Sequence, residues 1–401
     1  MSVIQGRITW KRLKQSMKNF DLSVPPIPII YFHSVGPKNP RWVRNFLTLE
    51  LEYFEAQLKI FSEYFKVISL YDYWEILNGR RQHIKNSIVI TFDDGYLDNW
   101  LWAFPLLKKY NFPATIFVSP EFVDANAGAR PIKRDFNPNR TNCNELETGG
   151  YLSWEEMKIM ENSGLIDIQS HTLTHTKYFV SDIIIGFHHP GDDCLYPVGN
   201  LFPDWKPFSI SNSKFEKLIP YGYPFFEEKS AITANRVWIN DNFNNEIIEA
   251  LRKYDFNKYD FNTVNNSIQS IYSDYKKRNL IIIKTESAKE YKERIANEIF
   301  MSRYLIDKNL KKETKFICWP HGDSNEFAHR KAIESGYLAS TLGSYKGEYN
   351  PGERIETRIG INSFKNSRLL TKLKSIYKIY SAMHRNPYYF VNQVYEGLKY
   401  R

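Results

Sequence analysis

The sequence predicts an α/β fold in which parallel strands alternate with helices, as in a barrel or a doubly wound sheet. Short apolar runs rich in β-branched residues recur along the chain, and segments of helical periodicity separate several of them. Strand and helix in alternation indicate crossover connections between parallel strands. With 401 residues, of which 42% are hydrophobic and 16% aromatic, the chain can also bury one large core or two modest ones.

The predicted elements follow the chain in order. The strands cover residues 27–32, 65–70, 87–92, 114–118, 165–170, 315–319 and 337–341, and the helices cover 49–64, 99–110, 153–164 and 288–310. The helix over 153–164 also carries boundary signals, because Ser153 and Glu156 form a capping-box pattern and Gly164 suits a helix end.

Residues 177–290 interrupt the alternation of strands and helices. They are rich in Asn, Asp, Pro, Tyr and Phe, and an unstructured loop of this length would be unusual in a compact domain. We therefore expect a folded insertion within a main domain over residues 27–362. A basic amphipathic segment over 1–26 precedes this domain, and a basic helical extension over 363–401 follows it.

The net charge of +9 belongs to the two ends of the chain. Residues 1–20 carry a net charge of +5 and residues 363–401 carry +7, which leaves about −3 for the body between them. Both ends have apolar residues at helical spacing, so we expect surface helices that either dock on the body or attach to an anionic membrane face. The sequence has no known nucleic-acid-binding motif, and we expect no nucleic-acid partner.

Cysteine usage and hydropathy give expectations about location. Cys143, Cys194 and Cys318 stand far apart without CxxC spacing, which argues against a disulfide framework or a thiolate zinc site. The first residues lack a continuous apolar core, and no run of about 18 apolar residues occurs. We expect a cytoplasmic protein without a secretion signal, in peripheral contact with the inner face of the cytoplasmic membrane if the basic ends bind lipid.

Two predicted strands end in residues typical of a metal site. The strand over 87–92 is followed by Asp93 and Asp94, and Gly95 lets the backbone turn there. Such a strand end would lie at the carboxyl mouth of a parallel barrel, where these folds keep their chemistry. Two adjacent carboxylates need a proton or a cation beside them, and a divalent metal supplies that charge. Taken alone, the pattern more often marks a solvated turn.

The second strand end carries histidines. His171 follows the strand over 165–170, and His175 comes four residues later, a spacing that can present two imidazoles to one metal. By itself this pair would be incidental about as often as not. Combined with a carboxylate, it leaves coordination positions open for water and substrate, which favours metal-assisted hydrolysis.

On these residues the sequence resembles the NodB-type polysaccharide deacetylases of carbohydrate esterase family 4. TFDDGY at 91–96 is similar to the first motif of that family, and SHTLTH at 170–175 is similar to the second. FICWPHGD at 316–323 looks like a version of its YPYG element. IIYFHSVG at 29–36 is similar to the element that opens the poly-N-acetylglucosamine deacetylase branch. The resemblance covers about residues 28–176 and 290–362.

The resemblance implies a deformed (β/α) barrel of the NodB homology type that removes N-acetyl groups from amino sugars with one divalent metal. Zinc is the usual metal, with cobalt, nickel or manganese as alternatives. Asp94, His171 and His175 would bind the metal, and Asp93 would be the general base that deprotonates the attacking water. His33 would be the general acid for the leaving amine, its alternative being a core histidine.

The later motif departs from the family pattern. The candidate substrate-binding and oxyanion residues are His321, Trp319, Pro320 and Tyr96. His321 stands in place of a tyrosine and would offer its backbone N–H to the oxyanion. Trp319 is either an apolar wall of the site or a core residue. A further family element containing Arg and Ile fits either Arg354 or Arg358. A C-terminal acid motif found in other branches is not apparent, so the role of general acid rests on His33.

The insertion is expected to decide the substrate, an acetylated amino-sugar glycan that is polymeric, oligomeric or lipid-linked. His188, His189, Asp192, Asp193 and Trp205 could line a saccharide groove. A second metal site there is the less favoured interpretation, because the side chains of adjacent histidines diverge. Alternative functions are an O-acetyl esterase or deformylase on the same scaffold, or a carbohydrate-binding protein without turnover.

Overall fold

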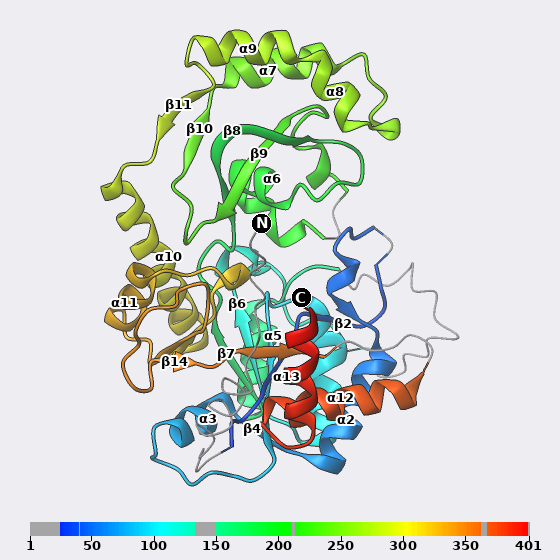
Figure 1. Cartoon of the computed structure of the whole chain (residues 1–401), viewed down its shortest axis with the longest axis vertical. Helices are drawn as coiled ribbons and strands as arrows, with labels where there is room; N and C mark the ends of the chain where they lie inside the picture. The colour runs from blue at the N-terminus through cyan, green and yellow to red at the C-terminus, as the bar shows by residue number, and fades with distance from the viewer. Residues whose placement is uncertain (1–24, 40, 133–148, 211–212, 362–366, 400–401) are drawn as a thin grey trace, which may run out of the picture.

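The central element of the computed structural model is a sheet of nine strands that all run parallel (Figure 1). The structure describes residues 25–39, 41–132, 149–210, 213–361 and 367–399. The strands are β1 (Ile29–Phe32), β4 (Lys66–Ile68), β5 (Ser87–Phe92), β6 (Ala114–Val118), β7 (Ile166–Ser170), β12 (Phe316–Ile317), β13 (Ala339–Thr341), β14 (Arg354–Ile355) and β15 (Arg358–Gly360). Eight of them follow the order β14-β13-β12-β7-β6-β5-β1-β15, and β4 pairs with β5.

The sheet curls because one segment of chain serves both of its edges. Within residues 354–360, β14 pairs with β13 and β15 pairs with β1, the strands next to the two edges. The sheet must therefore bend until its edges meet the same short segment, although β14 and β15 do not pair with each other among the described strands. The predicted deformed (β/α) barrel is confirmed.

Helices surround the barrel, as the alternating pattern predicts. They are α2 (Leu51–Tyr64), α3 (Leu70–Leu77), α4 (Phe104–Tyr110), α5 (Trp154–Asn162), α10 (Ala288–Leu310) and α11 (Glu326–Glu334). The capping box is present at α5, where the Ser153 hydroxyl accepts from the Glu156 N–H and the Glu156 carboxylate accepts from the Ser153 N–H. Every predicted strand contains an observed one. Among these barrel elements, the sequence analysis missed α3, α11, β14 and β15.

Alternation along β5 separates the two cores of the barrel. Ile88, Ile90 and Phe92 pack outward in a large cluster with the helices, whereas Val89 faces the barrel interior with residues such as Phe117. All six residues of β5 are buried. Asp93 lies four residues after Val89, so the same alternation directs its side chain toward the inside of the barrel mouth.

Residues 177–290 fold into a structure of their own above the barrel (Figure 1). It contains two antiparallel pairs, β8 (Lys177–Phe187) with β9 (Pro224–Ser230) and β10 (Val237–Ile239) with β11 (Ile282–Thr285), and the helices α6 (Leu195–Leu201), α7 (Asp241–Leu251), α8 (Phe261–Ser267) and α9 (Gln269–Lys277). Phe187, Phe226 and Phe243 form part of its separate core. A second cluster packs Tyr196 of the insertion against Tyr96 of the barrel mouth.

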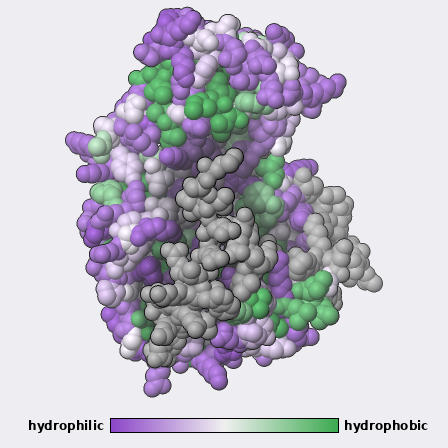
Figure 2. All heavy atoms as spheres, in the orientation of Figure 1, coloured by the Kyte–Doolittle hydropathy of each residue, from purple (hydrophilic) through white to green (hydrophobic). Residues whose placement is uncertain are grey.

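The C-terminal extension contains α12 (Arg368–Ala382) and α13 (Tyr388–Lys399). Ile379 packs into the outer core, whereas Leu369, Leu370 and Leu373 are exposed. Figure 2 shows apolar surface at the lower right, in the region where α12 lies in Figure 1. None of the described helices is both long and apolar enough to cross a membrane. The expectation for residues 1–20 lies outside the described residues, and the predicted domain boundaries stay predictions.

A candidate metal-dependent active site

The site begins where β5 ends. Asp93 is 4% exposed, and the chain then turns through two residues in the left-handed region, Asp94 at φ 73° and Gly95 at φ 69°. Gly95 is needed here, because a Cβ atom would lie 2.8 Å from the Val118 side chain in addition to the unfavourable φ. This turn lets two consecutive carboxylates reach one site from different directions.

Asp94 lies between the two predicted histidine ligands. Its Oδ1 atom is 3.3 Å from His171 Nε2 and 3.1 Å from His175 Nε2. The chain reaches this arrangement through Thr172 at φ 64° and His175 at φ 41°, which reverse the backbone after β7. One ligand atom from each of the three residues lies within 4.8 Å of the other two, which is close enough for a single metal ion to contact all three.

The hydrogen bonds around this group fit a bound cation. His171 Nδ1 is 2.9 Å from the Cys318 carbonyl oxygen, which can only accept, so Nδ1 carries the proton and a neutral ring directs a lone pair from Nε2 toward Asp94. Asp94 Oδ1 is buried without a hydrogen bond among the described residues. A lone pair that faces a carboxylate oxygen needs a cation or a proton between them. Two imidazoles and a carboxylate suit zinc and neighbouring divalent metals.

Asp93 has a different environment from Asp94. Arg358 donates from Nη1 and Nη2 to its two oxygens over 2.6 Å and 2.8 Å. Burial alone would raise the pKa of Asp93, but Arg358 and then His171 outweigh burial and lower this pKa below its usual value. Asp93 is therefore ionised at neutral pH and can accept a proton.

The structure also chooses between the two arginines left open by the sequence. Arg358 enters the site from β15, whereas Arg354 is turned to Glu356 and is 42% exposed. Cys318 adds a further contact that the sequence analysis missed, because its Sγ lies 3.0 Å from Arg358 Nη2. The sequence gives no indication of this contact, because Cys318 and Arg358 come together only through the pairing of β15 with β1.

His33 lies near Asp93. Its Nε2 is 3.9 Å from Asp93 Oδ2, and its side chain is 25% exposed. The ring is therefore reached by solvent, which the predicted role of a proton donor requires and a core histidine would not show.

The segment after β12 places the remaining predicted residues. His321 has φ 60°, and its ring centroid is 4.8 Å from that of His175. Pro320 is buried in the same turn. Trp319 is 1% exposed and packs in a core cluster with Ile299. Of the two interpretations of Trp319, a core residue therefore fits the structure and an apolar wall of the site does not.

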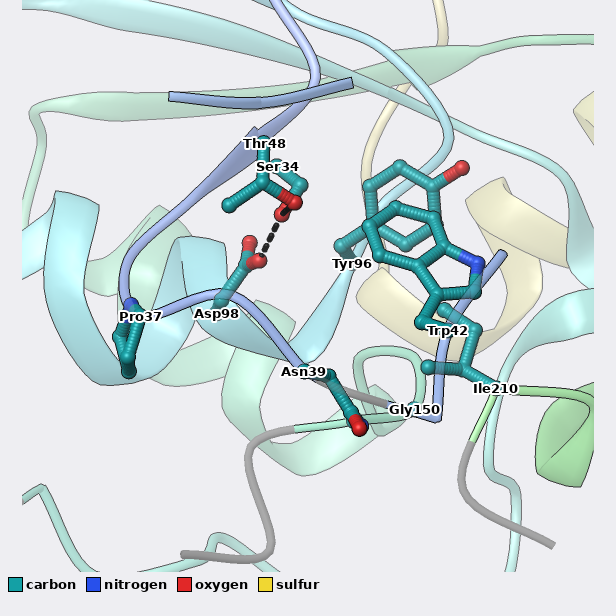
Figure 3. Close-up of a pocket in the computed structure, with 10 residues that line it drawn as sticks. Ser34, Pro37, Asn39, Trp42, Thr48, Tyr96, Asp98, Gly150 and Ile210 are labelled. Carbon is teal, nitrogen blue, oxygen red and sulfur yellow. Dashed lines mark hydrogen bonds between the residues drawn. The ribbon is translucent and has the colours of Figure 1, made fainter. Parts of the chain in front are cut away.

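Tyr96 separates two small pockets at the barrel mouth. One is lined by Asp94, His175, Arg44 and Leu195 as well as Tyr96. Figure 3 shows the other, where the Trp42 ring lies against Tyr96 and Asp98 points to the Ser34 hydroxyl. Tyr96 is 3% exposed, so it forms the wall between the two pockets and offers little surface for contact with a substrate.

Arg44 of the main domain and Tyr196 of the insertion, neither of which the sequence analysis named, come together with Asp193 beside the site. Arg44 Nε donates to Asp193 over 2.6 Å, and its Nη1 lies 3.2 Å from the Tyr196 hydroxyl. The Tyr196 ring centroid is 5.4 Å from that of His321. Of the residues expected to line a saccharide groove, His188 is fully buried and therefore does not do so.

Comparisons with known proteins agree with the motifs. Residues 80–184 match the family model described as polysaccharide deacetylase. YxkH of Bacillus subtilis strain 168, which carries the name of a polysaccharide deacetylase, is 29% identical over 152 residues, 38% of this chain and 44% of that protein. The match thus spans less than half the length of this relative.

Two solved structures are similar at the level of the fold. The de-N-acetylase from Aggregatibacter actinomycetemcomitans has a TM-score of 0.48 and 17% identity over 83% of this chain and 94% of that chain. IcaB from Ammonifex degensii has a TM-score of 0.46 and 14% identity over 88% and 97%. With identities and TM-scores this low, neither structure bears on what this chain acts on.

The barrel and the family match define the class of this domain. Residues 80–184 are similar to the polysaccharide deacetylase family, in agreement with the motifs at 91–96 and 170–175. The resemblance recognised in the sequence is confirmed at this level. The metal, the substrate and the roles of single residues are matters for the proposal that follows.

Proposed function

We propose that this chain is a metal-dependent hydrolase that removes N-acetyl groups from amino sugars of a glycan. The observation that carries the proposal is the pairing of Asp93 with Arg358 beside the group formed by Asp94, His171 and His175. In this proposal Asp94 holds the cation, and Asp93, paired with Arg358, serves as the ionised base beside it. A hydrolase that activates water needs both.

The geometry supports a division of roles for amide hydrolysis. Asp93 takes the proton from the attacking water, while Arg358 keeps both Asp93 oxygens oriented and ionised. His33 gives a proton to the leaving amine, so the C–N bond breaks to yield acetate and a free amino sugar. Asp94, His171 and His175 would hold a divalent metal, which would supply Lewis acidity for the carbonyl and a lowered pKa for the attacking water. His321 would offer its backbone N–H to the developing oxyanion.

Other substrates remain within the proposal as alternatives. An O-acetyl ester or an N-formyl group would pass through a similar tetrahedral oxyanion, so the same residues could act on either. A carbohydrate-binding protein without turnover is disfavoured by the Asp93–Arg358 pair, because a binder has no use for an ionised base beside a metal group. The element around His33 favours the poly-N-acetylglucosamine branch.

The test is acetate and formate release from N-acetylglucosamine oligomers and from matched O-acetyl and N-formyl saccharides. The assay is run after chelation and again after addition of zinc, cobalt, nickel or manganese. Wild type is expected to release acetate from the N-acetyl substrate only with metal. Asp93→Asn should keep the metal and lose about 10²- to 10⁴-fold in turnover, and His171→Ala should lose metal affinity.

The control for these variants is Asp274→Asn, an exposed carboxylate on α9 that should leave activity unchanged. The proposal fails if wild type binds metal and releases no acyl group from any of these saccharides. It also fails if Asp93→Asn turns over at the rate of wild type.

We also infer a location at the inner face of the cytoplasmic membrane. Support comes from α12, whose exposed Leu369, Leu370 and Leu373 lie in sequence beside Lys372 and Lys374 on a helix without an acidic residue. Leucines flanked by lysines suit the surface of an anionic bilayer. The cytoplasmic side stays a prediction from the sequence.

A further inference from the structure

A second group of metal-ligating side chains lies in the insertion, in the loop that follows β8. His188 Nδ1 is 2.9 Å from Asp192 Oδ2. Cys194 completes the group, since one ligand atom from each of the three residues lies within 4.8 Å of the others. His188 is fully buried, and Cys194 is 5% exposed. These residues are separate from the three at the ends of β5 and β7.

The hydrogen bonds of His188 require a positive charge at its Nδ1 side. His188 Nε2 lies 2.6 Å from the Glu216 carbonyl oxygen, which can only accept, so Nε2 carries a proton. A neutral ring then has its lone pair on Nδ1, and this lone pair faces the Asp192 carboxylate, another acceptor. A proton or a metal ion must stand between them.

The same arrangement occurs at the candidate active site. There His171 uses Nδ1 to donate to the Cys318 carbonyl and directs Nε2 toward Asp94. In both groups a backbone carbonyl fixes one ring nitrogen and leaves the other aimed at a carboxylate. A backbone carbonyl behind a histidine in this way is the usual outer support of a histidine that binds a metal.

The charges around Cys194 favour a cation. Burial and then Asp192, Asp193 and Glu216 raise the pKa of the Cys194 thiol. Arg44 pairs with Asp193, one of these three carboxylates. The three carboxylates that contribute to this shift would also attract a divalent ion.

We propose that His188, Asp192 and Cys194 form a second divalent-metal site of the zinc type, with solvent completing the coordination. Nitrogen, oxygen and thiolate sulfur are ligands that zinc accepts together. Binding releases the thiol proton to solvent as the Cys194 sulfur bonds to the metal, so the charge balances. The lack of CxxC spacing concealed this group in the sequence, because its members are spaced four and two residues apart.

The second site would fix the loop that reaches the active site. Asp193 lies between Asp192 and Cys194 in the chain and binds Arg44. Tyr196 follows two residues after Cys194 and packs beside His321. A metal on His188, Asp192 and Cys194 would hold these contacts in place. The inference concerns metal content and does not depend on which acyl group the enzyme removes.

The first test counts metal ions in the intact full-length protein by elemental analysis after loading with zinc and removal of the excess. Wild type is expected to hold two equivalents. Cys194→Ser and Asp192→Asn should each lose one of them, whereas His171→Ala should lose the other. Because the wild-type count needs no variant, a folding defect in a variant cannot hide the answer.

The second test replaces zinc by cobalt, which gives a thiolate-to-cobalt charge-transfer absorption when a cysteine is a ligand. The band should be present in wild type, lost in Cys194→Ser and retained in Cys318→Ser, the matched control for the thiol near the active site. One zinc equivalent in wild type, with no thiolate band, would overturn the proposal. In that case a proton, and not a metal ion, would lie between His188 Nδ1 and Asp192.

Discussion

Arg358 holds both oxygens of Asp93, and this pair joins the last strand of the sheet to the end of β5. The substitution Arg358→Met should lower turnover by about 10²-fold, because Asp93 loses the partner that fixes the direction of its carboxylate and favours its ionised form. Lysine should restore only part of the rate, since a single ammonium cannot make both bonds. The measurement is kcat for acetate release at saturating metal.

Arg354→Met is the matched control for this prediction. Arg354 is an arginine four residues earlier that is turned to Glu356 instead of the site, so its loss should leave kcat within a few-fold of wild type. Circular dichroism on both variants separates a catalytic loss from unfolding. Equal losses in the two variants would contradict the assignment of Arg358.

Asp98 gives a prediction about pH and stability. Burial raises its pKa to about 7, although hydrogen bonds from Ser34, from the Val35 N–H and from Asn99 favour the ionised form. Between the usual pKa of 3.8 and about 7, the folded chain therefore binds more protons at Asp98 than the unfolded chain does. The contribution of Asp98 to stability is greatest below this window and falls as the pH rises through it.

Asp98→Asn should remove this pH dependence. The free energy of unfolding of the variant, relative to wild type, should increase from about pH 5 to about pH 8. Urea unfolding at both pH values gives the measurement, with Asp274→Asn as a control at an exposed carboxylate. The same pH slope in wild type and Asp98→Asn would show that the Asp98 carboxyl group is not protonated in the fold.

The residues of the site could be predicted only in part. Asp93, Asp94, His171 and His175 follow directly from strand ends, and parallel strands bring their carboxyl ends to one mouth. Arg358 could not be separated from Arg354 by sequence, since the choice depends on the register of β15 against β1. The contact between Arg44 and Asp193 joins residues that are far apart in sequence and follow no periodic pattern.

Among the elements, α12 carries the prediction about membranes. Leu369 is 66% exposed and Leu373 is 55% exposed, beside basic residues on the same helix. Replacing both leucines by Gln should weaken binding to vesicles of anionic lipid several-fold, because less apolar surface enters the interface. Sedimentation of the full chain with such vesicles at low and high salt measures the effect.

Leu77→Gln is the control for surface apolarity, since Leu77 is 45% exposed at the end of α3, a helix that contains no basic residue, in contrast to α12. It should leave vesicle binding unchanged. A wild-type chain that stays in the supernatant with anionic vesicles at low salt would exclude the membrane proposal and leave the deacetylase proposal intact.

Element prediction succeeded where strands are long and fully buried, as in β5 and β6. It failed for β14 and β15, whose sequences RI and RIG begin with arginine and form no apolar run. The insertion gave no clear pattern because β8 is a long strand with half-buried residues on both faces. Its burial depends on β9, which lies far along the chain and is not visible in a local window.

On the scale of the whole molecule, the barrel does not rely on the metal group for its core. Phe92 and Val89, next to the ligands in sequence, pack into two separate apolar clusters on the two faces of the sheet. The ligands lie only at the mouth, on turns that follow β5 and β7. Loss of the metal should therefore weaken the fold without abolishing it, in contrast to small domains that fold only with zinc.

Chelation should lower Tm by a few degrees while the far-UV circular dichroism of the native state is kept. A ligand at about 100 times its Kd adds roughly 2.7 kcal/mol to the free energy of unfolding, so Tm should rise with zinc concentration. His171→Ala removes one of the two proposed sites, and its Tm should respond to zinc less than that of wild type. Differential scanning calorimetry across a zinc titration measures both. Collapse of the circular dichroism on chelation alone would mean that the metal belongs to the folding of the barrel, and that the apolar clusters on the two faces of the sheet are insufficient to hold it.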